Sequence, residues 1–169
     1  MKKHPILTVV GVLLVIYLII DALGALGFMP TIHSQQAPAA TATPKPNAVT
    51  AAMVADMVDG VFKNNFPYSY ETKLDEASGQ FNVDVWSPDI NAESIEETKN
   101  GSHAIWDNMV SNLISTTATI QNAFDENGHQ EIVAVLSLCD PNNHDITYLT
   151  IANGVAGYDV VNGVDLLNK

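Results

Sequence analysis

The sequence predicts one α+β domain with the element order α-β-β-α-β-β-β, in which two helices pack on one face of an antiparallel sheet. Three observations predict this fold class. Apolar residues recur at helical spacing in two segments, they alternate with polar residues in several others, and turn-forming residues separate the segments. Each helix then has one apolar stripe and the sheet has one apolar face, which a two-layer arrangement buries together.

The first helix and a hairpin open the domain. Asn47 and Thr50 are both suitable N-cap residues, and apolar side chains recur every three or four positions from Val54 to Phe62. A hairpin with its turn at 76–79 comes next. Its alternating positions are Tyr68, Tyr70, Thr72, Leu74, Phe81, Val83 and Val85. The polar residues between them predict a sheet that is covered on one side only.

The second helix has the clearest pattern in the chain. Its apolar stripe consists of Ile105, Trp106, Met109, Val110, Leu113, Ile114, Thr117, Ile120 and Phe124. Two helix-start signals lie upstream, a proline at the first helical position in 87–89 and a capping box in 94–97. We expect Asn100-Gly101 to interrupt this region and Asn127-Gly128 to end the helix.

Three strands are expected in the remainder, over residues 131–138, 146–152 and 155–161. Asn153-Gly154 between the last two is typical of a type I′ turn, which requires positive φ at both positions. The complete element order resembles that of profilin-like or roadblock-like folds, and less closely that of cystatin-like folds. An analogy at the level of the fold implies no function.

Residues 1–28 are expected to form a membrane segment. Residues 6–28 contain one charge, Asp21, and as a helix they would span ~34 Å, enough to cross a bilayer. Lys2 and Lys3 precede the segment, so the positive-inside rule places the N-terminus in the cytoplasm and the domain outside. The alternative is a signal peptide cleaved after Gly24 or Ala39, which would release a secreted domain. We favour the uncleaved anchor because the apolar stretch exceeds a common signal-peptide core.

Residues 29–48 read as a linker rich in Pro, Ala and Thr, and residues 49–169 as the folded domain. The domain is strongly acidic, with four lysines, no arginine and eighteen acidic residues, a formal charge of −14. Nucleic-acid binding is excluded because it depends on the neutralisation of phosphates by lysine and arginine. The charge favours cations or basic proteins as partners, or it serves solubility alone.

The chain contains no nucleophile elbow, zinc-protease, phosphate-loop or dinucleotide motif, so we expect no enzyme, cofactor or metal. The segment from Cys139 to Asp145 is the one cluster with possible metal ligands, for calcium or zinc. It lacks the glycine and glutamate of an EF-hand, and we interpret it as a polar β-turn. Cys139 follows an apolar run and is expected to be a buried thiol, the alternative being an intermolecular disulfide.

Trp86 falls out of phase with the apolar positions of its strand, so it is the best candidate for a contact residue. Tyr68 and Tyr70 complete the candidate contact surface, and Tyr148 and Tyr158 are further tyrosines that could line a groove with Trp86. Trp106 lies on the helix stripe and is expected in the core.

Three short patterns carry a resemblance. These are Phe81-x-Val83-x-Val85-Trp86, Ala104-x-Trp106-Asp107-x-Met109 and Asn153-Gly154-Val155-x-x-Tyr158-Asp159. They are similar to small uncharacterised extracytoplasmic domains behind N-terminal anchors in Gram-positive bacteria, a resemblance that implies no activity. From the layout of anchor, linker and domain we expect a non-enzymatic domain that contacts a protein partner at the cell envelope. A sensor or carrier of a small ligand or cation is the alternative.

Overall fold

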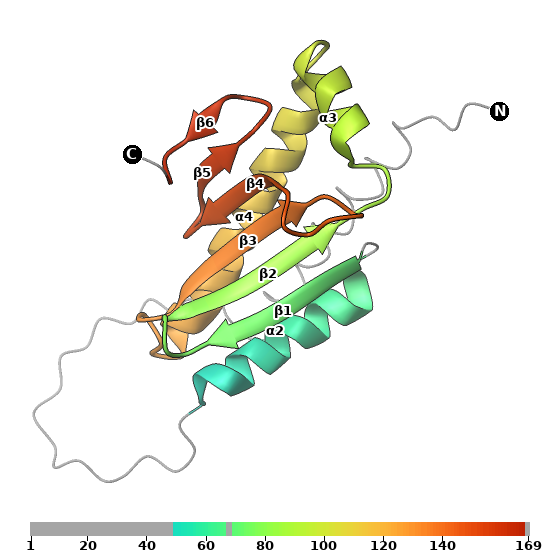
Figure 1. Ribbon diagram of the computed structural model, residues 1–169. Helices are drawn as coiled ribbons and strands as arrows, with labels where there is room; N and C mark the ends of the chain where they lie inside the picture. Colours follow the sequence, from blue (N-terminus) through green and yellow to red (C-terminus); the bar gives the residue numbers. More distant parts are fainter. Residues whose placement is uncertain (1–48, 67–68, 168–169) are drawn as a thin grey trace, which may run out of the picture.

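Six strands form one mixed sheet in which the strand order follows the chain, β1 to β6 (Figure 1). The computed structural model describes residues 49–66 and 69–167, so the expected membrane segment, the linker and Tyr68 lie outside the described residues. Within those two ranges, no helix is long and apolar enough to cross a bilayer. The strands are β1 (Ser69–Asp75), β2 (Gln80–Trp86), β3 (Val133–Cys139), β4 (Thr147–Ala152), β5 (Val155–Asp159) and β6 (Val164–Asp165).

The prediction of an all-antiparallel sheet is wrong for one pair of neighbouring strands, because β2 and β3 are parallel. The reason lies in the connection between them. Residues 87–132 contain α3 (Ala92–Lys99) and the long helix α4 (Ala104–Glu126). Because α4 carries the chain back along the sheet, β3 starts at the same end as β2, the geometry of a helical crossover. All other neighbouring strands are antiparallel.

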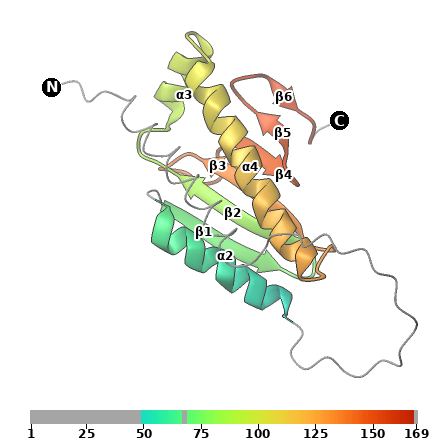
Figure 2. The same ribbon diagram turned by 180° about the vertical axis from the view of Figure 1, so that it is seen from behind.

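The helices α2 and α4 pack on one side of the sheet. In Figures 1 and 2, which view opposite sides of the molecule, α4 lies behind the sheet in one and in front of it in the other, while α2 (Ala51–Asn65) runs along β1. One apolar core joins both helices to the sheet. Its largest fully buried side chains are Phe62, Phe81, Phe124, Ile120, Leu136, Leu138, Leu149 and Ile151. Trp106 is buried in this core, as the sequence predicts.

Local signals placed most helix ends correctly. Thr50 caps α2, where its hydroxyl accepts a hydrogen bond from the Met53 amide at 3.2 Å. The glycine after α4, Gly128, has a φ of +86°, and it stops the helix where predicted. The capping box of α3 differs from the prediction. Asn91 is its N-cap, and Ser94 supplies the reciprocal bond from the third helical position, so Ser94 does not itself begin the helix.

Three polar contacts, two of them buried, join the helices and loops. Gln121 on α4 donates to the Ile132 carbonyl at 2.8 Å and accepts from the Ala134 amide at 2.8 Å, which fastens the helix to the start of β3. His129 Nε2 lies 2.9 Å from the carbonyl oxygen of Val49, so the loop after α4 holds the start of the described chain. The third contact, around Asp159, ties α4 to β5.

Candidate functional site

The face of the sheet opposite the helices is the first candidate site. Directly paired residues on neighbouring strands share a face, so the strand register identifies its side chains. One row across the strands consists of Glu71, Asp84, Ser137, Thr150 and Tyr158. The adjacent row consists of Lys73, Asn82, Val135, Ala152 and Val155. Neither α2 nor α4 packs on these rows, and we call this surface the open face.

Trp86 lies on the open face, half-buried at the end of β2. Its ring stacks on His144, whose own side chain comes from the loop between β3 and β4, with 4.0 Å between ring centroids and 39° between planes. The His144 ring packs against the indole and holds it at the surface. A tryptophan fixed in this way presents a large, rigid contact area at low entropic cost. The pair therefore forms an aromatic platform beside the polar row.

Two carboxylates lie next to this platform. Glu71 and Asp84 are directly paired across β1 and β2, an arrangement in which like charges repel. Burial raises the pKa of the Asp84 carboxyl and the nearby Glu71 charge adds to the increase, whereas a Ser137 hydrogen bond and His144 act in the opposite direction. The open face can therefore attract a positively charged group.

Cys139 is buried and has no disulfide partner among the described residues. Burial raises the pKa of its thiol, and the charge of Asp84 adds to this effect, while a hydrogen bond with Thr147 opposes it. A thiol with a raised pKa remains protonated and unreactive at neutral pH. The prediction of a buried cysteine is confirmed.

Tyr70, grouped with Trp86 in the sequence prediction, lies on the opposite face of the sheet. Its cross-strand partner is Val85, a core residue, whereas Trp86 pairs with Ser69. The Tyr70 ring packs against Phe62 with centroids 5.4 Å apart. Tyr68 lies outside the described residues, and of the two predicted contact residues that the structure describes, Trp86 belongs to the open face and Tyr70 does not.

The other two tyrosines also separate, since Tyr158 is on the open face and Tyr148 is buried. The Tyr148 hydroxyl donates to the Asp140 carboxylate, and burial together with this bond raises the pKa of Tyr148 to about 12.

The segment from Cys139 to Asp145 forms the polar turn that its composition predicts. Asp140 Oδ1 accepts the amides of Asn142 at 2.8 Å and Asn143 at 3.1 Å, and its other oxygen accepts the Tyr148 hydroxyl. Its carboxylate is thus engaged in shaping the loop. In the part of the chain that the structure describes, no group of three or more His, Cys, Asp or Glu side chains is placed to hold a metal ion.

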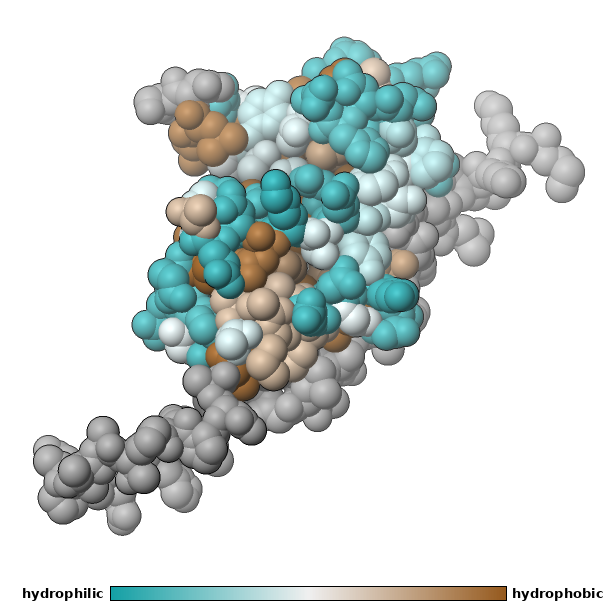
Figure 3. Space-filling view, turned by 60° about the horizontal axis from the view of Figure 1, so that its bottom comes forward, coloured by the Kyte–Doolittle hydropathy of each residue, from teal (hydrophilic) through white to brown (hydrophobic). Residues whose placement is uncertain are grey.

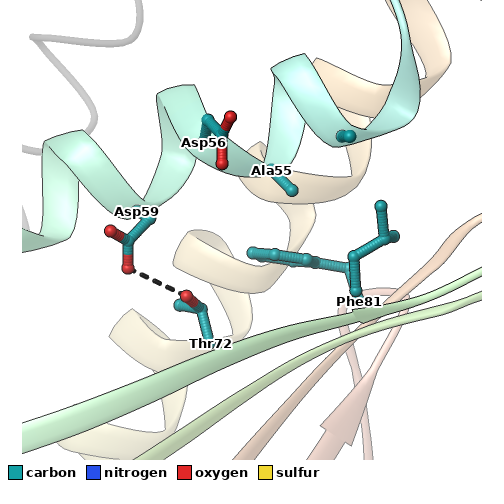
Figure 4. A pocket seen from close by; sticks show the side chains of 7 residues that line it. Ala55, Asp56, Asp59, Thr72 and Phe81 are labelled. Carbon is teal, nitrogen blue, oxygen red and sulfur yellow. Dashed lines mark hydrogen bonds between the residues drawn. The ribbon is translucent and has the colours of Figure 1, made fainter.

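A pocket of about 290 Å³ between α2 and the β1 end of the sheet is the second candidate site (Figure 4). It is lined by Ala52, Ala55, Asp56, Asp59, Thr72, Leu74 and Phe81. In the close-up, Phe81 rises from the sheet toward α2, and Asp59 reaches down from the helix to Thr72, whose hydroxyl donates to Asp59 Oδ1 at 2.8 Å. The lining thus combines an apolar floor with two carboxylates on one helix.

The sequence pattern did not point to this pocket or to the stacking of His144 on Trp86. Asp56 and Asp59 read as ordinary polar positions of an amphipathic helix. The available signal was their spacing of three, which places both carboxylates on one side of α2. His144 belongs to a loop, and its contact depends on a loop conformation that the sequence pattern does not encode.

Comparison of the chain with models of protein families, with curated proteins and with solved structures found no match in any of the three.

Proposed function

We propose that this chain is a membrane-tethered, extracytoplasmic domain that binds a protein partner through the open face of its sheet. Residues 6–28 would anchor it, the linker 29–48 would hold it away from the bilayer, and the N-terminus would lie in the cytoplasm. In this proposal the domain acts by binding and performs no catalysis.

The open face is the observation that carries the proposal. It presents the Trp86–His144 platform, the apolar side chains of Val135 and Val155, and hydroxyl groups, without cover from α2 or α4. Protein interfaces are enriched in aromatic anchors surrounded by polar groups. The pair of exposed Glu71 and half-buried Asp84 further suits a partner with positive charge.

Site-specific photocrosslinking on intact cells tests the proposal. The full-length chain would carry a photoreactive amino acid at Asn82 or Thr150 on the open face, or at Ser111 on the outer side of α4 as the matched control. We expect the same partner protein to be captured from both open-face positions and not from Ser111. Crosslinks from Ser111 alone, or none at all from protein that reaches the cell surface, would contradict the proposal.

Substitution of Trp86 provides the second arm of the test. Trp86→Ala should abolish capture from Asn82, whereas Trp86→Phe, which keeps an aromatic ring, should retain part of it. A thermal melt of each variant shows that the fold persists. If Trp86→Ala captures the partner as well as the wild type does, the Trp86–His144 platform is not part of the interface.

The tether requires a separate measurement, cell fractionation combined with the intact mass of the protein. A full-length mass in the membrane fraction supports a single-pass anchor. A mass beginning after Gly24 or Ala39, found in the medium, supports the alternative of a secreted domain.

A second candidate function is binding of a small ligand or cation, and the Glu71–Asp84 pair beside Trp86 favours it. A ligand that binds only the native state raises the melting midpoint. Thermal melts with and without millimolar calcium therefore test the cation version, and an unchanged midpoint would argue against it.

A further inference from the structure

We propose that β1 accepts an extended, basic segment of a partner protein as an additional strand of the sheet, with a lysine or arginine of that segment in the pocket beside α2. This surface is the outer edge of β1 together with the pocket on the α2 side, whereas β1 contributes only Glu71 and Lys73 to the open face, so the inference goes beyond the function proposed above. It rests on three features that meet at one edge of the molecule: a long edge strand, a pocket and the two carboxylates of α2 that line this pocket.

The first feature is the edge itself. The sheet ends in β1 on one side and β6 on the other. β6 has only two residues, a length that blunts an edge, whereas β1 has seven residues and pairs only with β2 within the described chain. Every second residue of such a strand directs its N–H and C=O outward, which is the arrangement that accepts an added strand.

The second feature is the pocket next to this edge. Leu74 and Phe81 form its apolar floor, and Asp56 and Asp59 stand on the α2 side. A lysine or arginine combines an apolar stem with a cationic head, so it matches a pocket with this division. Alternate side chains of an added strand point toward the α2 side of the sheet, where one of them could enter the pocket.

The exposed surface of α2 beyond the pocket also suits contact with a protein segment. Figure 3, in which the side of the molecule with α2 comes forward, shows apolar side chains gathered in a patch among hydrophilic ones. Met53 is 53% exposed and Met57 39% exposed, on a different flank of α2 from the residues that line the pocket. Flexible methionine side chains are common on surfaces that bind peptides.

Charge selects the occupant. The domain carries a formal charge of −14, and a second copy of the chain on β1 would bring its own Asp56 and Asp59 toward this edge. The chain's own linker contains Pro38, Pro44 and Pro46, each of which lacks the N–H that a strand donates. A basic segment of another protein brings no additional negative charge to this edge and is not interrupted by these prolines.

Selection from a random nonapeptide library tests the inference. The bait is the full-length chain in phosphatidylcholine nanodiscs, and empty nanodiscs remove peptides that bind lipid. We expect the selected peptides to share a lysine or arginine at one position within a run of alternating β-branched residues. Selected peptides without a basic residue at a fixed position, or no enrichment at all, would overturn the inference.

A matched pair of double variants separates the pocket from the overall charge. Asp56→Asn with Asp59→Asn should weaken binding of a selected peptide by about tenfold or more, because a charge-assisted contact is lost. Glu97→Gln with Glu126→Gln removes two exposed charges elsewhere and should leave binding within about twofold. Equal weakening by both pairs would overturn the inference.

Hydrogen exchange on the same nanodiscs locates the contact. Addition of a selected peptide should slow exchange at β1 amides and leave those of β4 unchanged. If the outward-facing β1 amides already exchange as slowly before the peptide is added as after it, the linker or a second copy already covers the edge. If the peptide slows exchange only at residues of the open face, it binds there instead. Each of these two results overturns strand addition at β1, and neither bears on the photocrosslinking test of the open face.

Discussion

The indole Nε1 of Trp106 donates a 3.0 Å hydrogen bond to Oδ1 of Asp159, and both side chains are buried. The same carboxylate oxygen accepts the backbone amides of Val161 and Asn162, each at 3.0 Å. One buried carboxylate therefore joins the start of α4 to the turn that follows β5. Since β5 and β6 otherwise form a small edge of the sheet, this contact fixes the C-terminal part of the fold.

Trp106→Phe removes the indole donor and keeps an aromatic ring. We expect a loss of about 2 kcal/mol in the free energy of unfolding, because hydrogen bonds to a charged group contribute more than neutral ones. Urea unfolding of the full chain in micelles measures it. Trp86→Phe on the open face is the control, with an expected change within about 0.5 kcal/mol. Equal losses in the two variants would contradict the role of Asp159.

Gln121→Leu tests the contact between α4 and β3. The substitution preserves the approximate shape of the side chain and leaves the Ala134 amide and the Ile132 carbonyl without their partner. Buried unpaired backbone groups are costly, so we expect a destabilisation of about 3 kcal/mol. Asn122→Leu, an exposed position on the same helix, should change stability by less than about 0.5 kcal/mol. A cost below 1 kcal/mol at Gln121 would mean that water replaces its hydrogen bonds.

Two glycines in the left-handed region make a matched comparison. Gly79 and Gly163 have φ values of +67° and +66°. A Cβ on Gly79 would lie 2.7 Å from the Glu131 carbonyl oxygen, whereas a Cβ on Gly163 would meet nothing within 4 Å. Gly163→Ala should therefore cost about 1–2 kcal/mol for the backbone conformation alone, and Gly79→Ala should cost at least about 1 kcal/mol more. Similar denaturation midpoints for the two variants would show that the β1–β2 turn moves freely away from Glu131.

Tyr148→Phe should change the acid stability of the protein. The hydrogen bond from the Tyr148 hydroxyl is the largest cause that holds the pKa of the Asp140 carboxyl below its usual range, and the hydrogen bond from the Asn142 amide is the next largest. A group whose pKa is lowered on folding stabilises the protein above its unfolded pKa, and this contribution disappears as the pH falls through the folded pKa. The difference in melting temperature between wild type and variant should thus be largest above about pH 4 and shrink below it. A difference that stays constant from neutral to acidic pH would contradict this linkage.

The features that the sequence predicts correctly are those with a local physical cause. The Thr50 cap, the Gly128 stop and the Asn153-Gly154 turn each depend on a few adjacent residues, and Asn153 and Gly154 have φ values of +48° and +72°. The parallel pairing of β2 with β3 depends instead on where α4 returns the chain, which no short pattern encodes. The two-residue strand β6 is likewise too short to produce a periodic signal.

The candidate contact surface was predictable in part. The phase of Trp86 correctly placed it opposite the core residues Val83 and Val85. The same alternation places Tyr70 with the core, because it pairs with Val85, so parity within the hairpin already separated Tyr70 from Trp86. The position of His144 over Trp86 could not be predicted, since it depends on the hydrogen bonds that Asp140 makes within the loop.

The single parallel joint of the sheet has a kinetic consequence. The β1–β2 hairpin and the β3-to-β6 meander consist of contacts close in sequence, and only the β2–β3 seam closes a loop as long as residues 87–132. Loop closure costs entropy before the contacts that it permits are gained. The rate of folding should therefore be set by the meeting of two preformed halves at this seam. Substitutions there would slow folding, whereas substitutions at the hairpin tips would mainly accelerate unfolding.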